Sequence, residues 1–177
     1  MQSPVTTVSL LVLMVSLLTG FTHSNVNGQA NVTANAMAEV IQAITATETA
    51  QLNFGRFSPE MEGGKIILSP QGARTIEGTV VLGGGAPNPA KFTITGEYEA
   101  TFSINLPSAS ATLTNISNAK TMEVNGWESF PPSGIGVGKL AGGEMMVSIG
   151  AVLNIGNMAS NPVGIYIGTY AITFAYN

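Results

Sequence analysis

Glutamates are the side chains of this chain that come closest to a catalytic pattern. Glu60 and Glu62 lie two residues apart in a turn-like stretch, and Glu97 and Glu99 have the same spacing at a strand end. Two carboxylates that flank a sugar can serve as the acid and base of a glycosidase. Charges in turns and at strand edges are more commonly solvated, and they protect a sheet from aggregation. We therefore expect these glutamates to be solvated charges and not a catalytic pair.

The residues that other kinds of chemistry need are missing from most of the chain. Beyond residue 30 there is no Cys, no Asp and no His, because the one histidine is His23. A Ser-His-Asp or Cys-His relay cannot be built without them, and zinc and EF-hand calcium sites lose their usual ligands. Gly134–Gly138 has the glycines of a dinucleotide loop, but neither a βα unit before it nor a helix after it. The sequence predicts no enzyme activity, no catalytic residue, no metal site and no cofactor.

The charge of the chain is low and acidic. Lys and Arg number 6 against 10 acidic residues, the formal net charge is -4, and charged residues make up 9% of the chain. Ordinary globular domains carry about 25%. We expect no nucleic-acid partner, because no basic patch is available to neutralise phosphates. The abundant Gly, Ala, Thr, Ser, Asn and β-branched residues are typical of short strands joined by tight turns.

The first thirty residues predict a secretory signal peptide. Val8–Leu18 is an apolar run that suits the centre of such a peptide and is too short to span a bilayer. Small residues before Asn31 offer a cleavage site, so we assign residues 1–30 to the signal peptide. No Lys or Arg precedes the apolar run, so a retained membrane anchor stays as the alternative. We expect an exported protein, in the periplasm in transit and then at the cell surface or in an extracellular filament, with no transmembrane span in the mature chain.

Short runs of alternating apolar and polar residues recur from residue 50 onward. The longest is Glu144–Ile155, and Gly, Pro and Asn punctuate the gaps between runs. Alternation with a period of two is the pattern of half-buried strands. No helical period is visible after the front of the chain. The sequence therefore predicts an all-β fold, an antiparallel immunoglobulin-like β-sandwich over residues 50–177.

The last fourteen residues, from Gly164, predict a strand with one strongly apolar face. That face carries Tyr170, Ile172, Phe174 and Tyr176, and small residues alternate with them. A sandwich whose last strand is its most apolar one has no later strand to pair beside it. We therefore expect a sandwich that lacks its final strand and is completed by a strand from another polypeptide. Gly164 and the four large side chains would line the acceptor groove.

Residues 31–49 predict an N-terminal extension. In an extended conformation one face of this segment carries Val32, Ala34, Ala36, Ala38 and Val40. We interpret that face as a donor strand that fills the groove of a neighbouring subunit. The alternative is a flexible N-terminus that leads into the first strand. The register of a donor strand, and whether it acts within its own chain or in another, stay open.

Four blocks that occur in a fixed order carry a family resemblance. They are Leu52–Phe57, Leu68–Thr75, Phe92–Gly96 and Gly168–Asn177. Together they resemble a bacterial secreted domain family of unknown function, with a leading Leu-Asn-Phe-Gly strand and a terminal Gly-Thr-Tyr strand. The resemblance covers residues 40–177, nearly the whole mature chain. It implies a secreted β-sandwich with no known catalytic residues.

A second resemblance is to chaperone–usher pilus subunits. In those proteins a glycine lies fourteen residues from the C-terminus and an aromatic residue is penultimate, as Gly164 and Tyr176 are here. The resemblance implies donor-strand complementation, with a periplasmic chaperone, an outer-membrane usher and identical or related subunits as partners. Two features depart from the pattern. This chain has no Cys for the disulfide that many such pilins carry, and its arm offers mostly alanine where theirs offers bulky residues.

Two functions from different classes follow. The first is a structural subunit of a bacterial surface fimbria or filament assembled by donor-strand complementation. The second is a stand-alone secreted or cell-surface β-sandwich that binds a glycan or a protein. Trp127, the only tryptophan, is the candidate ligand surface of such a module, and the alternative for Trp127 is a buried core position.

Overall fold

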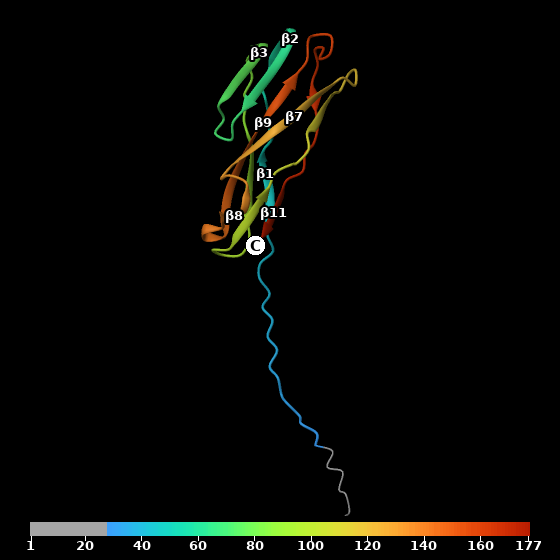
Figure 1. The fold of residues 1–177 in the computed structure, drawn as a ribbon. Coiled ribbons are helices and arrows are strands. Elements are labelled where there is room, and N and C mark those ends of the chain that lie inside the picture. The colour runs from blue at the N-terminus through green and yellow to red at the C-terminus, as the bar shows by residue number, and fades with distance from the viewer. Residues whose placement is uncertain (1–27) are drawn as a thin grey trace, which may run out of the picture. The chain divides into compact units, whose positions relative to one another are not determined.

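The computed structural model describes residues 28–177 (Figure 1). Residues 40–177 form one compact unit, separate from the residues before them. Every strand of the described chain and both of its buried apolar clusters lie within residues 40–177. This unit therefore contains its own core and can be treated as a domain that folds by itself.

The domain consists of antiparallel strands, with a short 3-10 turn at Ala141–Gly143 and no α-helix in the described residues. The strands are β1 (Thr45–Ala50), β2 (Phe57–Leu68), β3 (Arg74–Leu82), β4 (Ala90–Thr95), β5 (Thr101–Asn105), β6 (Ala111–Asn115), β7 (Thr121–Phe130), β8 (Gly134–Lys139), β9 (Glu144–Ile155), β10 (Tyr166–Ile167) and β11 (Thr173–Tyr176).

Two sheets make up the domain. The larger is an 8-stranded sheet with the order β1-β4-β9-β7-β6-β10, in which β2 also pairs with β9, and β3 pairs with β2. The smaller is a 3-stranded sheet with the order β11-β5-β8. Figure 1 shows β2 and β3 at one end of the domain, β8 and β11 at the other, and β9 running between them. The larger sheet curls into a half-barrel, and the predicted all-β antiparallel sandwich is confirmed.

The core follows from the alternation of the long central strand β9. Its inward residues from Val147 to Ile155 are buried, and those of the first half and the second half belong to two different clusters. One cluster surrounds Ile66 and Leu68 of β2, and the other surrounds Phe102 of β5. The half-buried side chains of Leu52 and Trp127 pack against both clusters, so they lie where the two clusters meet.

The first strand of the sheet begins earlier in the chain than the sequence analysis predicted. Residues 45–49, assigned above to the N-terminal extension, belong to β1, which pairs with β4 from Thr45 opposite Thr95 onward. Residues 28–44 contain no helix or strand, and the side chains of 28–43 are exposed. The extension that precedes the sheet is therefore shorter than expected and ends before residue 45.

The expected C-terminal strand is divided into two. Tyr166 and Ile167 form β10 beside β6 in the larger sheet, whereas Thr173–Tyr176 form β11 beside β5 in the smaller sheet. Residues 168–172 between them belong to neither sheet, because the chain crosses from one sheet to the other there. One continuous alternating sequence thus contributes to both layers of the sandwich.

The predicted signal peptide lies outside the described residues except for residues 28–30, as does His23. Within residues 28–177, no helix is long and apolar enough to cross a membrane.

Candidate functional site

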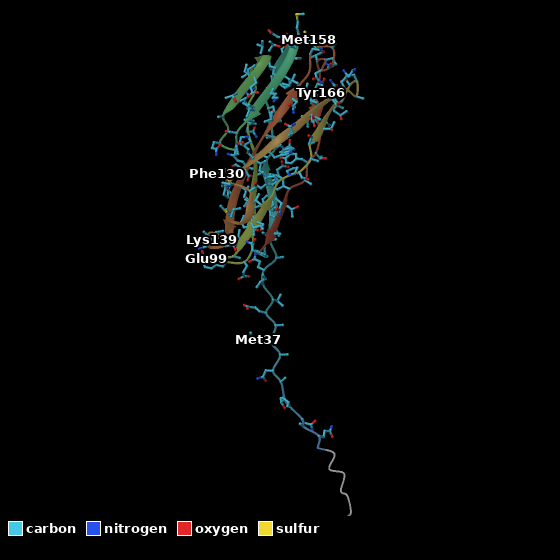
Figure 2. All side chains as sticks on the ribbon, in the orientation of Figure 1. Met37, Glu99, Phe130, Lys139, Met158 and Tyr166 are labelled. Atoms are coloured by element: carbon cyan, nitrogen blue, oxygen red, sulfur yellow. The ribbon has the colours of Figure 1, made fainter. Side chains whose placement is uncertain are left out.

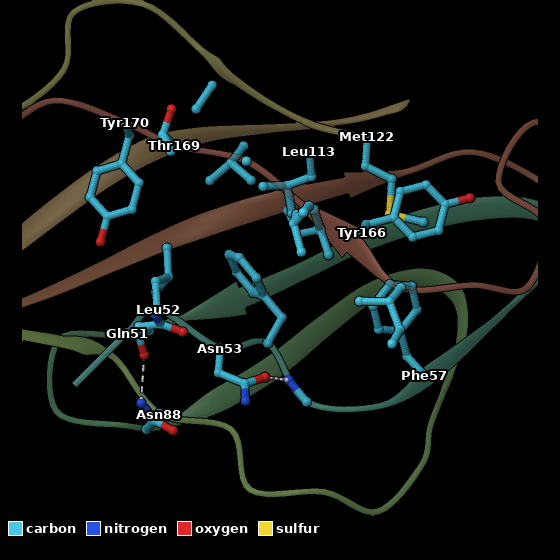
Figure 3. Close-up of a pocket in the computed structure, with 18 of the residues that line it drawn as sticks. Gln51, Leu52, Asn53, Phe57, Asn88, Leu113, Met122, Tyr166, Thr169 and Tyr170 are labelled. Carbon is cyan, nitrogen blue, oxygen red and sulfur yellow. Dashed lines mark hydrogen bonds between the residues drawn. The ribbon is translucent and has the colours of Figure 1, made fainter. Parts of the chain in front are cut away.

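The main candidate site is a groove of about 1830 Å³ that runs between β1, with the residues after it, and the C-terminal stretch. Figure 3 shows its lining around Leu52, Leu113, Met122, Tyr166 and Tyr170. The floor is apolar and comes from the inward residues of the larger sheet. The two walls are β1 with the residues that follow it and the crossing segment of the C-terminal stretch.

The first wall ends in an unpaired strand edge. The side chains of Ala46, Glu48 and Ala50 line the groove from β1. β1 pairs with β4 along one edge, and no strand of the described chain pairs with its other edge. An edge strand of this kind presents free N–H and C=O groups to any extended chain that approaches it.

The second wall is the crossing segment Gly168–Ile172, which pairs with no strand of the described chain. Tyr170 and Ile172 line the groove and pack against the cluster around Phe102. Gly168 lies so close to β6 that a Cβ atom there would collide with the backbone oxygen of Thr112. The groove is thus framed by β1, one edge of which is unpaired, and by the unpaired segment Gly168–Ile172.

Aromatic side chains fix the groove's lining. The rings of Trp127 and Tyr170 lie with centroids 4.6 Å apart and planes tilted by 31°. The ring centroid of Phe174 in β11 lies 5.9 Å from that of Phe92 and 6.2 Å from that of Phe102. Aromatic pairs at such distances add stability beyond the area they bury. The rings therefore hold the C-terminal stretch against the floor of the groove.

The hydroxyl of Tyr170 is the one buried side-chain N or O atom of the described residues that has no hydrogen-bond partner. Burial, and to a smaller extent the negative charge of Glu48, raise the pKa of Tyr170 to about 12. The hydroxyl is therefore protonated at neutral pH and can act as a hydrogen-bond donor.

Tyr176 holds the residues that lead into β1. Its hydroxyl accepts a hydrogen bond from the N–H of Glu97 at 2.6 Å and donates one to the carbonyl of Gln42 at 3.0 Å. The N–H of Gln42 in turn donates to Glu97 Oε2 at 2.8 Å. The peptide groups of residue 42 are thus held on both sides, and the free part of the N-terminal segment ends there.

The glutamates of the two pairs are either exposed or bound to neighbouring groups. Glu97 binds Gln42, whereas Glu99 binds Lys139 at 2.5 Å (Figure 2), and the hydrogen bond from Lys139 lowers the pKa of Glu99. Glu60 and Glu62 are exposed on β2. No group of three metal-ligating side chains is present in the residues that the structure describes.

Comparison with protein families gives one match. Residues 44–176 match the family model described as a domain of unknown function, DUF4402. The chain belongs to the DUF4402 family. No curated protein matches the chain. The resemblance to a family of unknown function is confirmed, whereas the resemblance to pilus subunits stays a prediction.

The DUF4402 domain brings together most of the residues predicted for the acceptor groove. Gly164, Tyr170, Ile172 and Phe174 line the groove, and Gly164 lies directly against the side chain of Asn115. Tyr176 does not line it and instead holds Gln42.

Trp127 is half-buried in the DUF4402 domain. One part of its ring packs against both core clusters, and the ring also lines the groove. Its Nε1 donates to the carbonyl of Ala109 at 3.4 Å. The two alternatives for Trp127, core and contact surface, therefore both describe part of its position.

The residues predicted for the donor face are exposed and belong to no strand: Val32, Ala34, Ala36, Ala38 and Val40. Val32 is 87% exposed and Val40 is 97% exposed. The β1 wall of the groove was missed from the sequence, because the alternation of residues 45–50 resembles that of residues 31–40.

Proposed function

We propose that this protein is a structural subunit of a bacterial surface filament, in which a strand from one subunit enters the groove of the next. The observation that carries the proposal is the pair of unpaired backbone edges, β1 and Gly168–Ile172, on either side of an apolar groove. A strand placed between them would satisfy backbone groups on both sides and bury its inward side chains.

The occupant that we propose is the segment of residues 31–41 from a second copy of the chain. This segment has exposed apolar residues and lies before the anchored residue Gln42. Eleven extended residues span about 36 Å, which is the length of a long strand. Because the segment has no strand partner of its own, it and the groove both offer backbone groups that pairing would satisfy.

We call residues 31–41 the arm. Its composition makes backbone pairing the main source of its affinity for the groove. Burial of a valine is worth about 1.5–3 kcal/mol, and an alanine contributes considerably less. A face of two valines and three alanines gives on the order of 5 kcal/mol by that scale. Each ladder hydrogen bond adds about 0.5–1.5 kcal/mol. We therefore expect a filament that is held less tightly than one built from Leu, Ile or Phe arms.

The proposal includes export and assembly factors. The predicted signal peptide would direct the chain to the periplasm, where a chaperone would lend a strand to the groove until an usher exchanges it for the arm of the next subunit. The final location would be the cell surface or an extracellular filament. These steps rest on the resemblance to chaperone–usher pilus subunits.

Two arm variants with the same added charge test the proposal. Ala36→Asp places a carboxylate on the proposed inward face, and Asn35→Asp places one on the opposite face. A buried unpaired carboxylate is strongly unfavourable. We expect Ala36→Asp to reduce assembly of the mature chain at least tenfold and Asn35→Asp to leave it nearly unchanged, as measured by sedimentation velocity and electron microscopy.

The outcomes separate the alternatives. Filaments that form equally well from both variants would count against strand insertion through this face. A wild-type chain that stays monomeric, and in which proteolysis of residues 31–41 is slow, would indicate that the arm fills the groove of its own chain.

A stand-alone binding module is the second candidate. The half-buried Trp127, whose ring lines the groove beside Tyr170, favours it. A monomeric chain whose Trp127 fluorescence responds to a glycan or protein ligand, and not to the arm peptide, would support this function over the first.

A further inference from the structure

The arm is covalently joined to a domain whose own groove it could fill. A strand tethered beside its site has an effective concentration of about 1 mM, so with subunits at about 10 µM it outcompetes the strand of a second copy roughly 100-fold. An arm that can fold back therefore closes its own groove and ends assembly. This advantage is lost only where the geometry of the tether forbids folding back. A filament thus requires a feature that keeps each arm out of its own groove.

The residues before β1 are poorly suited to a reversal of the chain. To fill its own groove, the arm would have to turn there and run back along the free edge of β1. Short turns between antiparallel strands use residues with positive φ, which are mostly Gly, Asn or Asp. Residues 36–50 contain no Gly, Pro, Asn or Asp. The two residues at the centre of such a turn, Gln42 and Ala43, are not among those with positive φ in the structure.

Gln42 is also held in place by a ring of hydrogen bonds, which we call the clamp. Its N–H donates to Glu97 Oε2 at 2.8 Å, and its carbonyl accepts from the hydroxyl of Tyr176 at 3.0 Å. The same hydroxyl accepts from the N–H of Glu97 at 2.6 Å. Tyr176 belongs to the last strand, β11, so the residue that follows the arm is bound to the other end of the chain. A turn centred on Gln42 would have to break these bonds.

Ile44 provides a second anchor before β1. Its side chain is half-buried and packs against the cluster around Phe102. A wider loop, which needs no turn residue, would have to release Ile44 and Gln42 or begin within the arm itself. A loop that begins within the arm uses up Val40 and Ile41, so fewer residues of the arm are left to pair. Both ways of folding back are therefore disfavoured.

We propose that the clamp of Gln42, Glu97 and Tyr176, together with the stretch without turn residues, excludes the arm from its own groove, so that the groove takes the arm of a second copy. This inference rests on the proposed function, because it requires a groove that accepts a strand. It goes further by identifying the residues that make the pairing intermolecular. Tyr176 acts as a positioning residue, because it does not line the groove.

Supplying a turn tests the exclusion. Gln42→Asn combined with Ala43→Gly creates the Asn-Gly sequence that short hairpin turns prefer. In the mature chain we expect this variant to raise the concentration needed for assembly at least about tenfold, because its arm fills its own groove. In the diluted monomer, cleavage of residues 31–41 by a protease should be at least about tenfold slower than in the wild type. Gln42→Asn alone keeps the backbone groups that the clamp binds and supplies no glycine, so this matched control should behave as the wild type does.

Two tyrosines separate the clamp from the missing turn. In the Asn-Gly variant, an added peptide of residues 31–41 competes with the chain's own arm. Tyr176→Phe removes the hydroxyl that opposes folding back, so in this background the apparent Kd of the peptide should rise about 2-fold to 10-fold. Tyr98→Phe, a change beside Glu97 at a side chain that is 69% exposed, should leave that Kd unchanged. Neither tyrosine lines the groove, so neither change should alter the affinity of the peptide for the domain of residues 40–177.

The outcomes distinguish the inference from the function beneath it. If the peptide does not bind the domain of residues 40–177 in a calorimetric titration, strand insertion fails and the inference fails with it. If the peptide binds but the Asn-Gly variant assembles as readily as the wild type, only the inference is overturned. An equal Kd for Tyr176→Phe and Tyr98→Phe would overturn the role of the clamp.

Should the Asn-Gly variant not fold, proteolysis of the diluted wild-type chain decides. We expect residues 31–41 of the monomer to be cleaved as fast as the free peptide, because the arm lies outside its own groove. Protection of these residues in a monomeric wild-type chain would place the arm in its own groove and overturn the inference.

Discussion

At the residue scale, Tyr170 lowers the free energy of unfolding of the domain as the pH rises in the alkaline range. The pKa of this tyrosine is raised from 10.0 to about 12, mainly by burial. Between these values the folded state keeps a proton that the unfolded state loses. Stability from this group is therefore fully present below pH of about 10 and is lost as pH rises toward about 12.

Urea unfolding of residues 40–177 across this pH range would test the expectation. The wild type should lose more free energy of unfolding between pH of about 10 and about 12 than Tyr170→Phe does. The tyrosinate absorbance of the wild type should include one late ionisation that Tyr170→Phe lacks. Identical pH profiles for the two proteins would show that Tyr170 is not buried as described.

The sequence predicted which face Tyr170 shares with its neighbours, but not that its segment leaves the sheets. Alternation correctly grouped Tyr170 with Ile172 and Phe174, because the period of a strand fixes which residues share a face. The same pattern gave no sign that residues 168–172 leave both sheets. That crossing depends on tertiary contacts such as the approach of Gly168 to Thr112, which no local pattern encodes.

At the element scale, β1 separates the arm from the domain. Five of its six residues pair with β4, and Ala46, Glu48 and Ala50 line the groove. We expect a chain that starts at residue 40 to melt within a few degrees of the mature chain, because it keeps β1 and the contacts of Gln42. A chain that starts at residue 51 should be strongly destabilised, since it exposes the edge of β4 and opens one wall of the groove.

Circular dichroism melts of the two truncated chains, together with their tendency to aggregate, measure this difference. A chain starting at residue 51 that melts like the longer one would mean that β1 adds nothing to the domain. In that case residues 45–50 would belong with the arm as part of an exchangeable strand. The sequence could not place this boundary, because residues 45–50 alternate much as residues 31–40 do and the pairing with β4 is what distinguishes them.

At the scale of the whole molecule, the surfaces that would meet in the proposed filament carry little charge. The chain has a formal net charge of -4 and only 9% charged residues. Glu48 and Arg56 line the groove, and Glu39 is the one charged side chain of the arm. Assembly through this groove would therefore depend on backbone pairing and apolar burial, with little contribution from charged side chains.

This balance predicts that salt does not dissolve the filament. At ~1 M ionic strength the screening length falls to about 3 Å, so any interaction of Glu39 with Glu48 or Arg56 is screened and apolar burial is retained. We expect sedimentation of the assembled mature chain to be unchanged or slightly faster in high salt. Glu48→Gln, which removes one of these charges without salt, should likewise leave assembly nearly unchanged. Dissociation by salt would mean that ion pairs hold the subunits together. Glu39 with Arg56 is the one pair of opposite charges that the arm and the groove lining offer, so either that pair or a contact elsewhere on the domain would then hold the subunits.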